Sequence, residues 1–290
     1  MNIAFIGTGL MGFPMVKNLL KNNFKVKIFS RTLKKAKPLE EFGGIVVNSL
    51  KGASNEADII FTMLTDDDAV EKVMDELIFS NYLKPNTTVI DMSSIKPKTA
   101  VKYGNILKDK KINFLDSPVS GGTIGAENAN LAIMVGGDKK IFDKVFEILK
   151  SMGNPILVGP IGSGQISKLA NQIIVGVTIG AVAEAITLCE KADIDPNKFI
   201  SALSGGFADS KILQNHGKKM IDKNFVPGGK VSTHLKDMNN ILESAKNFKI
   251  NLPISNLIKD MFFSLDKNGN GNDDHSAIYK EIERINKLKD

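Results

Sequence analysis

A run of glycines near the N-terminus is the first of three motifs whose residue types and spacing could do chemistry. It stands between a predicted strand at Ile3–Ile6 and a predicted helix at Gly12–Leu20. In a dinucleotide-binding turn of this kind, Gly7 permits the tight turn, Gly9 lets the backbone approach a pyrophosphate, and Gly12 lets the helix pack on the strand. The free N–H groups at the start of the helix then hold the phosphates. The pattern favours a dinucleotide site over a turn without a ligand, and its residues are Gly7, Thr8, Gly9, Leu10, Met11 and Gly12.

A serine followed by two glycines forms the second motif, after a predicted strand at Asn113–Asp116. Ser120, Gly121 and Gly122 would present consecutive backbone N–H groups beside a hydroxyl, a concave arrangement that suits a carboxylate. Taken alone, the segment is equally compatible with a structural loop.

The third motif places a lysine near the start of a long, apolar predicted helix at Ser163–Lys191. Lys168, Asn171 and Gln172 are spaced by three and four residues, so the helix presents them on one face. Burial on an apolar helix favours the neutral amine, which could exchange a proton with a substrate. A surface lysine whose stem lies along the helix is the alternative.

The residues after the second predicted strand, Lys25–Phe29, indicate which dinucleotide would bind. Sites that prefer NAD usually have Asp or Glu here for the ribose hydroxyls, whereas this chain has no acid between Lys25 and Leu39. Arg31 could grip a 2′-phosphate in bidentate fashion, with Ser30 and Thr32 as further donors. We predict a preference for NADP(H). NAD(H) remains the alternative, because an arginine can also cover the adenine face.

The elements that must position these motifs alternate between short β-branched runs and amphipathic stretches up to about residue 158. This alternation is typical of βαβ units in a mainly parallel sheet, which right-handed crossovers make doubly wound. The predicted strands are Ile3–Ile6, Lys25–Phe29, Ile45–Val47, Asp58–Met63, Thr88–Asp91, Asn113–Asp116, Ala132–Val135 and Pro155–Val158.

The strand pattern stops near Gly162, and only helices are predicted from there on. Because the helix at Ser163–Lys191 is apolar on nearly all sides, we expect it to be buried between neighbours. The sequence therefore predicts an α/β domain over residues 1–161 and an all-α domain over residues 162–290. The other predicted helices of the second domain are Pro196–Leu203, Ser210–Met220, Leu235–Asn247, Ile254–Leu265 and Ser276–Leu288.

Composition excludes several classes of protein. With 290 residues, 42% hydrophobic and 24% charged, the chain is long enough for two globular domains and too apolar to be disordered. Its net charge of +6 comes from scattered lysines without a basic stripe or interleaved aromatics, so we expect no nucleic-acid partner. The single cysteine, Cys189, excludes an intrachain disulfide.

Neither a metal site nor a membrane segment is predicted. His216, His234 and His275 share no ligand spacing with Cys189 or with one another. The N-terminal run has no basic leader, and the longest apolar stretch, Ile173–Cys189, carries a glutamate and is short for a membrane span. We expect a cytoplasmic protein without a membrane partner.

Together the motifs resemble the β-hydroxyacid dehydrogenase family over essentially the whole chain. The resemblance is carried by the glycine turn, Asp116–Gly122, Gly162–Gln172, His234–Asp237 and Asn272–Ala277, in the family's order and spacing. It implies a Rossmann-type doubly wound domain followed by an all-α domain, joined by one long helix.

The resemblance also implies roles for single residues. Lys168 matches the catalytic lysine, and Ser120, Gly121 and Gly122 match the loop that binds the substrate carboxylate. Asn171 and Gln172 match a polar pair near the substrate, where many relatives have two asparagines, so which amide contacts substrate stays open. The matched cofactor residues are Met63, Leu64, Ser94 and Lys236; Thr65 stands where the family usually has proline.

The implied reaction is reversible hydride transfer between a nicotinamide cofactor and a small β-hydroxy acid or semialdehyde. Within the family, the chain is most similar to tartronate semialdehyde (2-hydroxy-3-oxopropionate) reductases. 3-Hydroxyisobutyrate is the alternative substrate, followed by succinic semialdehyde and glyoxylate. A non-catalytic nucleotide-binding protein on the same fold is the rival of another class. The apolar long helix and the relatives favour a homodimer or homotetramer.

Overall fold

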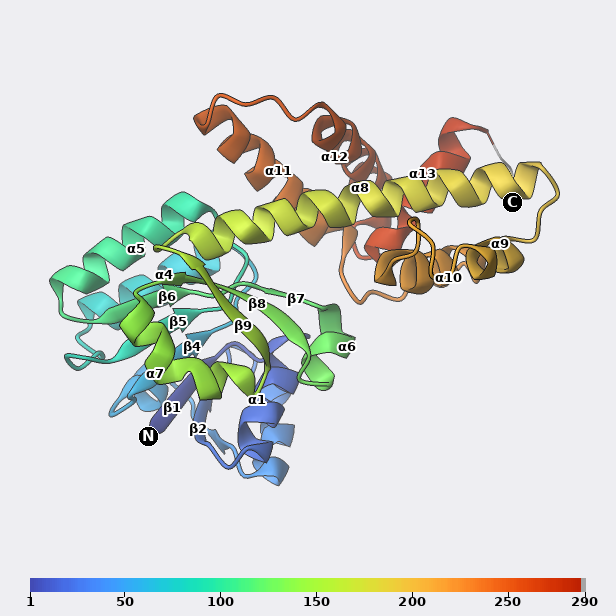
Figure 1. Ribbon diagram of the computed structural model, residues 1–290. Helices are drawn as coiled ribbons and strands as arrows, with labels where there is room; N and C mark the ends of the chain where they lie inside the picture. The colour runs from blue at the N-terminus through green and yellow to red at the C-terminus, as the bar shows by residue number, and fades with distance from the viewer. Residues whose placement is uncertain (288–290) are drawn as a thin grey trace. The chain divides into compact units, whose positions relative to one another are not determined.

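The computed structural model describes residues 1–287 of the chain. Contacts divide the chain into two compact units, Met1–Lys168 and Leu169–Asp290, which we call the nucleotide unit and the helical unit. The division falls inside one long helix, α8 (Ser163–Lys191), whose bounds are those predicted from the sequence. In Figure 1, α8 is the long yellow-green helix.

The nucleotide unit contains a sheet with strand order β3-β2-β1-β4-β5-β6-β8-β7, in which β9 pairs with β8. The first six strands in this order are parallel, β8 runs antiparallel to β6 and β7, and β9 is parallel to β8. The prediction of a mainly parallel, doubly wound sheet is confirmed. The strands are β1 (Asn2–Ile6), β2 (Lys25–Phe29), β3 (Ile45–Val46), β4 (Ile59–Thr62), β5 (Thr88–Asp91), β6 (Asn113–Asp116), β7 (Val119–Ser120), β8 (Leu131–Gly137) and β9 (Gly153–Gly159).

Helices cover both faces of this sheet because successive side chains of each buried strand point to opposite faces. Ile3 and Phe5 of β1 join one hydrophobic core, which includes residues of α1 and α7, whereas Ala4 and Ile6 join a second core with residues of α4 and α5. The helices of this unit are α1 (Gly12–Lys21), α2 (Leu33–Ala36), η1 (Lys37–Phe42), α3 (Leu50–Ser54), α4 (Asp67–Phe79), α5 (Pro97–Asp109), α6 (Gly122–Glu127) and α7 (Lys139–Lys150).

The helical unit packs its helices around the second half of α8. Ile179, Val182 and Ile186 of α8 lie in one core with apolar residues from the helices that follow. Those helices are α9 (Pro196–Ala202), η2 (Leu213–Gly217), α10 (Lys218–Ile221), α11 (Val231–Asn247), α12 (Pro253–Leu265), η3 (Asp266–Asn270), η4 (His275–Ala277) and α13 (Ile278–Ile285).

Three of the predicted helices need correction. The helix predicted at Leu235–Asn247 begins four residues earlier, at Val231. The stretch at Ser210–Met220 is not uniformly α-helical, because η2 is a π-helical turn. The last predicted helix begins as a 3₁₀ turn, since the Asp274 carboxylate accepts from the Ser276 N–H at 3.1 Å and fixes the turn before α13. Its predicted end, Leu288, lies outside the described residues.

The expectation that α8 is buried on all sides is wrong for one side of the helix. Ile174 and Leu188 are 66% and 72% exposed. Within residues 1–287, α8 is the helix that is long and apolar enough to cross a membrane by length and composition, and half of its apolar window is buried within the fold. Cys189 is buried, as expected.

Candidate active site

The glycine turn lies between β1 and α1, at the carboxyl end of β1. The strand order of the sheet reverses here, because β2 and β3 lie on one side of β1 and β4, β5 and β6 lie on the other. Gly7 has a φ of +102°, and a Cβ there would lie 2.3 Å from the Met63 carbonyl oxygen. A Cβ on Gly12 would lie 2.0 Å from the Gly7 oxygen, so α1 approaches the turn too closely for any side chain at this position. Gly9 has nothing within 4 Å of its Cβ position. The three glycines thus differ in the way a dinucleotide turn requires, with Gly9 at the open position.

Two features of this turn fit a bound dinucleotide. No side chain caps the N-terminus of α1, so its first N–H groups and dipole suit a phosphate. The hydroxyl of Thr8 is buried and has no hydrogen-bond partner among the described residues. A ligand oxygen could satisfy this buried hydroxyl beside the uncapped start of the helix.

The end of β2 lies next to the turn, because the Gly7 N–H donates to the Phe29 carbonyl at 2.9 Å. Ser30 is buried there, whereas Arg31 and Thr32 are exposed. The segment from Ser30 to Thr32 thus offers two hydroxyl groups and a guanidinium but no carboxylate.

The segment after β4 is held against β5 by an acid that the sequence analysis did not select. The Leu64 N–H donates to Ser93 Oγ at 2.9 Å, and Ser93 Oγ in turn donates to Asp91 Oδ1 at 2.6 Å. Thr62 Oγ1 donates to the same carboxylate oxygen at 2.7 Å. Asp91 therefore positions Met63 and Leu64, two of the residues matched to the cofactor. Its place at the carboxyl end of a buried strand was the available signal.

A second buried acid, Asp116 at the end of β6, fixes the start of α8. Its Oδ1 accepts from the Gly162 N–H at 2.7 Å, and its Oδ2 accepts from the Gln165 N–H at 2.9 Å. Gln165 is 1% exposed; its Nε2 donates to the Ser93 carbonyl at 2.8 Å and its Oε1 accepts from the Ile95 N–H at 3.1 Å. The first turn of α8 is thereby joined to the ends of β5 and β6. Neither residue's role was predicted.

The two acids are register partners in the sheet, Asp91 on β5 and Asp116 on β6. Burial raises the pKa of each carboxyl group to about 6, although hydrogen bonds to both oppose this shift. In Asp116 both oxygens are engaged by N–H groups, whereas Oδ2 of Asp91 is buried without a partner among the described residues. The two carboxylates thus differ in how well the fold satisfies them.

Lys168 follows this anchored turn on α8 and is 8% exposed, so it is not a surface lysine. Because Asp116 and Gln165 fix the preceding turn, the backbone that carries the amine is well determined. Ser120 closes β7, and Gly121 and Gly122, with φ of +139° and +61°, lead into α6 with their backbone exposed. This loop can present N–H groups to an anion.

In the helical unit, α8 and α11 form a polar network. Asn171 Nδ2 donates to Gln172 Oε1 at 2.9 Å, and Gln172 Nε2 donates to Asp237 Oδ2 at 2.8 Å. The other oxygen of Asp237 lies 3.3 Å from the Lys236 ammonium. Asp237 is 1% exposed, so this buried carboxylate joins the amide pair to the lysine that was matched to the cofactor. The His-Leu-Lys-Asp motif contained Asp237, but its spacing gave no sign of this contact.

The sequence-predicted cofactor residues of the nucleotide unit lie at the carboxyl ends of β1, β2, β4 and β5, the edge at which α/β sheets bind ligands. Ser120, Gly121 and Gly122 lie at the end of β7 and the start of α6, and Lys168 lies on α8. The predicted residues of the helical unit lie on α8 and α11. The three histidines, which showed no common spacing, lie side by side.

Comparisons with known proteins agree across both units. Residues 2–162 match the family described as the NAD binding domain of 6-phosphogluconate dehydrogenase. Residues 162–282 match the family described as NAD-binding of NADP-dependent 3-hydroxyisobutyrate dehydrogenase.

Whole relatives align with the full length of the chain. The 2-hydroxy-3-oxopropionate reductase of Escherichia coli (strain K12) is 39% identical and covers 98% of this chain and 97% of its own. The 2-(hydroxymethyl)glutarate dehydrogenase of Eubacterium barkeri is 31% identical, with coverage of 98% and 95%. Among solved structures, the 3-hydroxyisobutyrate dehydrogenase of Mycobacterium tuberculosis, solved with L-serine, has a TM-score of 0.88 at 27% identity and covers 97% of this chain and 98% of its own.

Proposed function

The chain belongs to the β-hydroxyacid dehydrogenase family of nicotinamide-dependent oxidoreductases, and from this premise we propose that it reduces 2-hydroxy-3-oxopropionate reversibly with NADP(H). The observation that carries the proposal is a buried lysine, Lys168, on a helix whose first turn is fixed by Asp116 and Gln165. 3-Hydroxyisobutyrate is the second candidate substrate, followed by succinic semialdehyde and glyoxylate.

Each group of residues has a distinct role in this proposal. A bound nicotinamide supplies or accepts the hydride. The glycine turn and the start of α1 hold the pyrophosphate, and Met63, Leu64, Ser94 and Lys236 hold the nicotinamide half. The N–H groups of Ser120, Gly121 and Gly122 hold the substrate carboxylate, and Lys168 donates a proton to the alkoxide that forms on reduction.

The amide that contacts substrate is assigned from the network around it. The Gln172 amide is engaged on both sides, since its oxygen accepts from Asn171 and its nitrogen donates to Asp237. We infer that Asn171 contacts substrate and that Gln172 holds Asn171 in place.

Replacement of the lysine tests the mechanism. Lys168→Ala should lower kcat by about 10²–10⁴-fold, the usual contribution of a general acid or base. Lys191→Ala, at the exposed end of the same helix, is the matched control and should leave kcat unchanged. If the two variants have equal turnover, Lys168 is not the proton donor. Cofactor binding by the wild type without turnover of any of the four acids would favour the non-catalytic alternative.

Cofactor choice is tested at the end of β2. We expect kcat/KM for NADPH to exceed that for NADH, and Arg31→Ala to reduce this ratio by about tenfold, the effect of one lost charge-assisted contact. Lys34→Ala is the control for a general loss of positive charge near the site. A wild type that prefers NADH, or a ratio that Arg31→Ala leaves unchanged, would remove the basis for NADP(H).

A homodimer or homotetramer is part of the same proposal. Exposed apolar side chains on the helical unit support it, including Ile174, Leu188, Leu257 and Phe263. Sedimentation at micromolar concentration should give a species larger than the 31.5 kDa chain. We also infer a cytoplasmic enzyme, because the inward side of α8 belongs to the core of the helical unit.

A further inference from the structure

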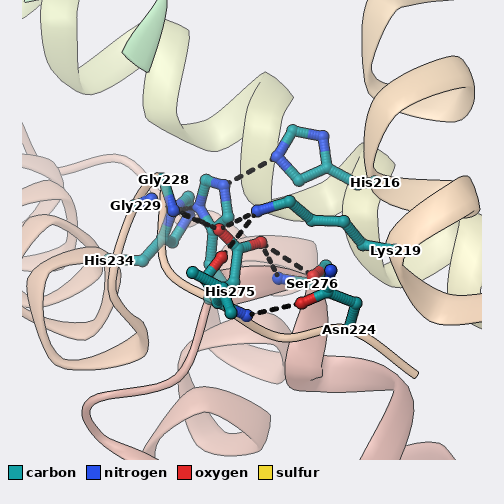
Figure 2. Close-up of polar contacts among 10 residues, drawn as sticks. His216, Lys219, Asn224, Gly228, Gly229, His234, His275 and Ser276 are labelled. Atoms are coloured by element: carbon teal, nitrogen blue, oxygen red, sulfur yellow. Dashed lines mark hydrogen bonds and ion pairs between the residues drawn. The ribbon is translucent and has the colours of Figure 1, made fainter. Parts of the chain in front are cut away.

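A chain of three imidazoles lies in the helical unit (Figure 2). Nε2 of His216 is 2.8 Å from Nε2 of His275, and Nδ1 of His275 is 3.1 Å from Nδ1 of His234. The successive ring centroids are 4.7 and 5.2 Å apart, with the rings edge to face. His275 therefore uses both of its ring nitrogens to connect η2, which carries His216, with α11, which carries His234.

The surroundings of the imidazoles favour uncharged rings. Burial lowers the pKa of His216 and of His275, and the neighbouring histidines add to this effect at His275. The charged groups that face the chain are Asp274 and Lys219, which form an ion pair at 2.7 Å. A neutral imidazole has one N–H and one acceptor nitrogen, so His275 in this form can donate one of the two ring-to-ring hydrogen bonds and accept the other.

The cluster is not arranged to bind a metal ion, although His216, Asp274 and His275 lie close enough to be considered as ligands. Asp274 Oδ2 already accepts from Lys219 Nζ at 2.7 Å and from the Gly228 N–H at 2.8 Å. Its Oδ1 accepts from the N–H and the hydroxyl of Ser276. A metal ion would have to displace these donors and approach the Lys219 ammonium.

Backbone hydrogen bonds beside Asp274 hold the start of α11. The His275 N–H donates to the Gly229 carbonyl at 2.8 Å, and the Val231 N–H donates to the Asp273 carbonyl at 2.9 Å. On the first turn of α11, the His234 ring is 1% exposed and packs against Phe262, with ring centroids 4.6 Å apart. A Cβ on Gly176 of α8 would lie 2.6 Å from His234 Nε2, so this ring fits directly against α8.

We propose that His275 is a positioning residue for the reaction, because through His234 it sets α11 and so the placement of Lys236 and Asp237. Lys236 and Asp237 follow His234 by two and three residues, and Asp237 holds Gln172 on α8. The inference rests on the proposed function, in which Lys236 contacts the cofactor. The clamp, by which we mean the hold of His275 on α11 through His234, can be measured without any ligand.

Two substitutions of His275 separate its two contacts. The amide of asparagine lies near the place of Nδ1, so His275→Asn keeps a partner for His234; the longer His275→Gln reaches the place of Nε2 and keeps a partner for His216. We expect KM for NADPH to rise about tenfold in His275→Gln and less than about twofold in His275→Asn, with kcat changing less than about threefold in either. Rescue by the shorter amide is the signature of positioning through His234.

Amide hydrogen exchange measures the clamp without cofactor. In His275→Gln, peptides covering residues 231–240 should exchange about tenfold faster than in wild type, while those covering α9 do not change. Tyr279→Phe is the control, since it removes a part-buried hydrogen bond from the Tyr279 hydroxyl to Glu190 of α8, in the same unit. It should lower the melting temperature and leave both KM and α11 exchange unchanged.

The outcomes distinguish this inference from the proposed function. If wild type turns over but His275→Gln matches Tyr279→Phe in KM and in α11 exchange, the positioning role is overturned. If wild type shows no turnover, the proposed function fails, and α11 exchange still decides whether His275 holds the helix. Stoichiometric binding of zinc at micromolar concentration that is lost in His216→Gln would identify a metal site and overturn the inference.

Discussion

Each unit of the molecule buries a cluster of titratable groups, and the two clusters have opposite chemistries. In the nucleotide unit, Asp91 and Asp116 stand at the ends of neighbouring strands and accept hydrogen bonds from the segments around the site. In the helical unit, three imidazole rings bridge η2, η4 and α11. Burial favours the uncharged form in both places, so it raises the pKa of the carboxyl groups and lowers that of the imidazoles. One physical cause therefore gives the two units opposite responses to pH.

The largest effect that would sharpen this comparison comes from the acids themselves. Asp116→Asn replaces one acceptor by an N–H donor that faces a backbone N–H, so we expect a loss of about 2 kcal/mol of unfolding free energy and about tenfold lower kcat as the start of α8 shifts. Asp91→Asn keeps the oxygen that receives all of its hydrogen bonds and should change stability by less than about 1 kcal/mol. Urea unfolding at pH 7 and steady-state kinetics measure both variants. Equal losses of unfolding free energy in the two variants would contradict this expectation. They would show that the hydrogen bonds to the two oxygens of a carboxylate do not determine its contribution to stability.

An intermediate effect is the opposite pH response of the two units. A carboxyl group with a folded pKa of about 6 holds its proton more tightly than in the unfolded chain, so the nucleotide unit should lose stability as pH rises from about 4 to 6. Histidines whose folded pKa lies below the ordinary 6.5 oppose protonation, so the helical unit should lose stability as pH falls below about 6.5. Between pH 7 and pH 5 we expect opposite changes of about 1–2 kcal/mol, measured by hydrogen exchange in each unit. Changes of the same sign would contradict the shared cause.

The smallest effect separates the titration of His216 from its hydrogen bond to His275. His216→Gln keeps a polar atom near the place of Nε2, and we expect it to cost less than about 1 kcal/mol at pH 7. It removes one titrating ring, so the acid-induced loss of stability in the helical unit should become shallower. The pH dependence of thermal unfolding measures this, with Tyr279→Phe as the variant that should shift the curve without changing its slope. An unchanged slope in His216→Gln would mean that its ring does not titrate with unfolding.

What could be predicted from the sequence follows from how local each feature is. The glycine turn and the bounds of α8 depend on neighbouring residues and were predicted correctly. The two-residue strand β7 has no periodicity to reveal it. The cap that Asp116 gives to α8 joins residues 46 and 49 positions apart, and Asp237 meets Gln172 across 65 positions. Such contacts depend on the fold, which spacing within one segment does not encode.

The histidines show the same limit most clearly. Consecutive members of the chain are separated by 59 and 41 residues, and sequence spacing suggested no relation among them. The fold brings them together because η2, η4 and α11 meet around Asp274. Residues with no motif in common can therefore form one hydrogen-bonded unit when a buried acid orders the backbone around it.

The capped start of α8 also restricts how the length of this helix can vary. Lys168 lies on a turn fixed by Asp116, and Asn171 and Gln172 come within the next turn of the same helix. Each residue of an α-helix turns the chain by about 100° and advances it about 1.5 Å. One residue inserted between Lys168 and Asn171 would turn the amide pair away from the amine without altering a single side chain. The spacing of this segment is therefore constrained more strictly than its composition, and related chains should tolerate substitutions here far better than insertions or deletions.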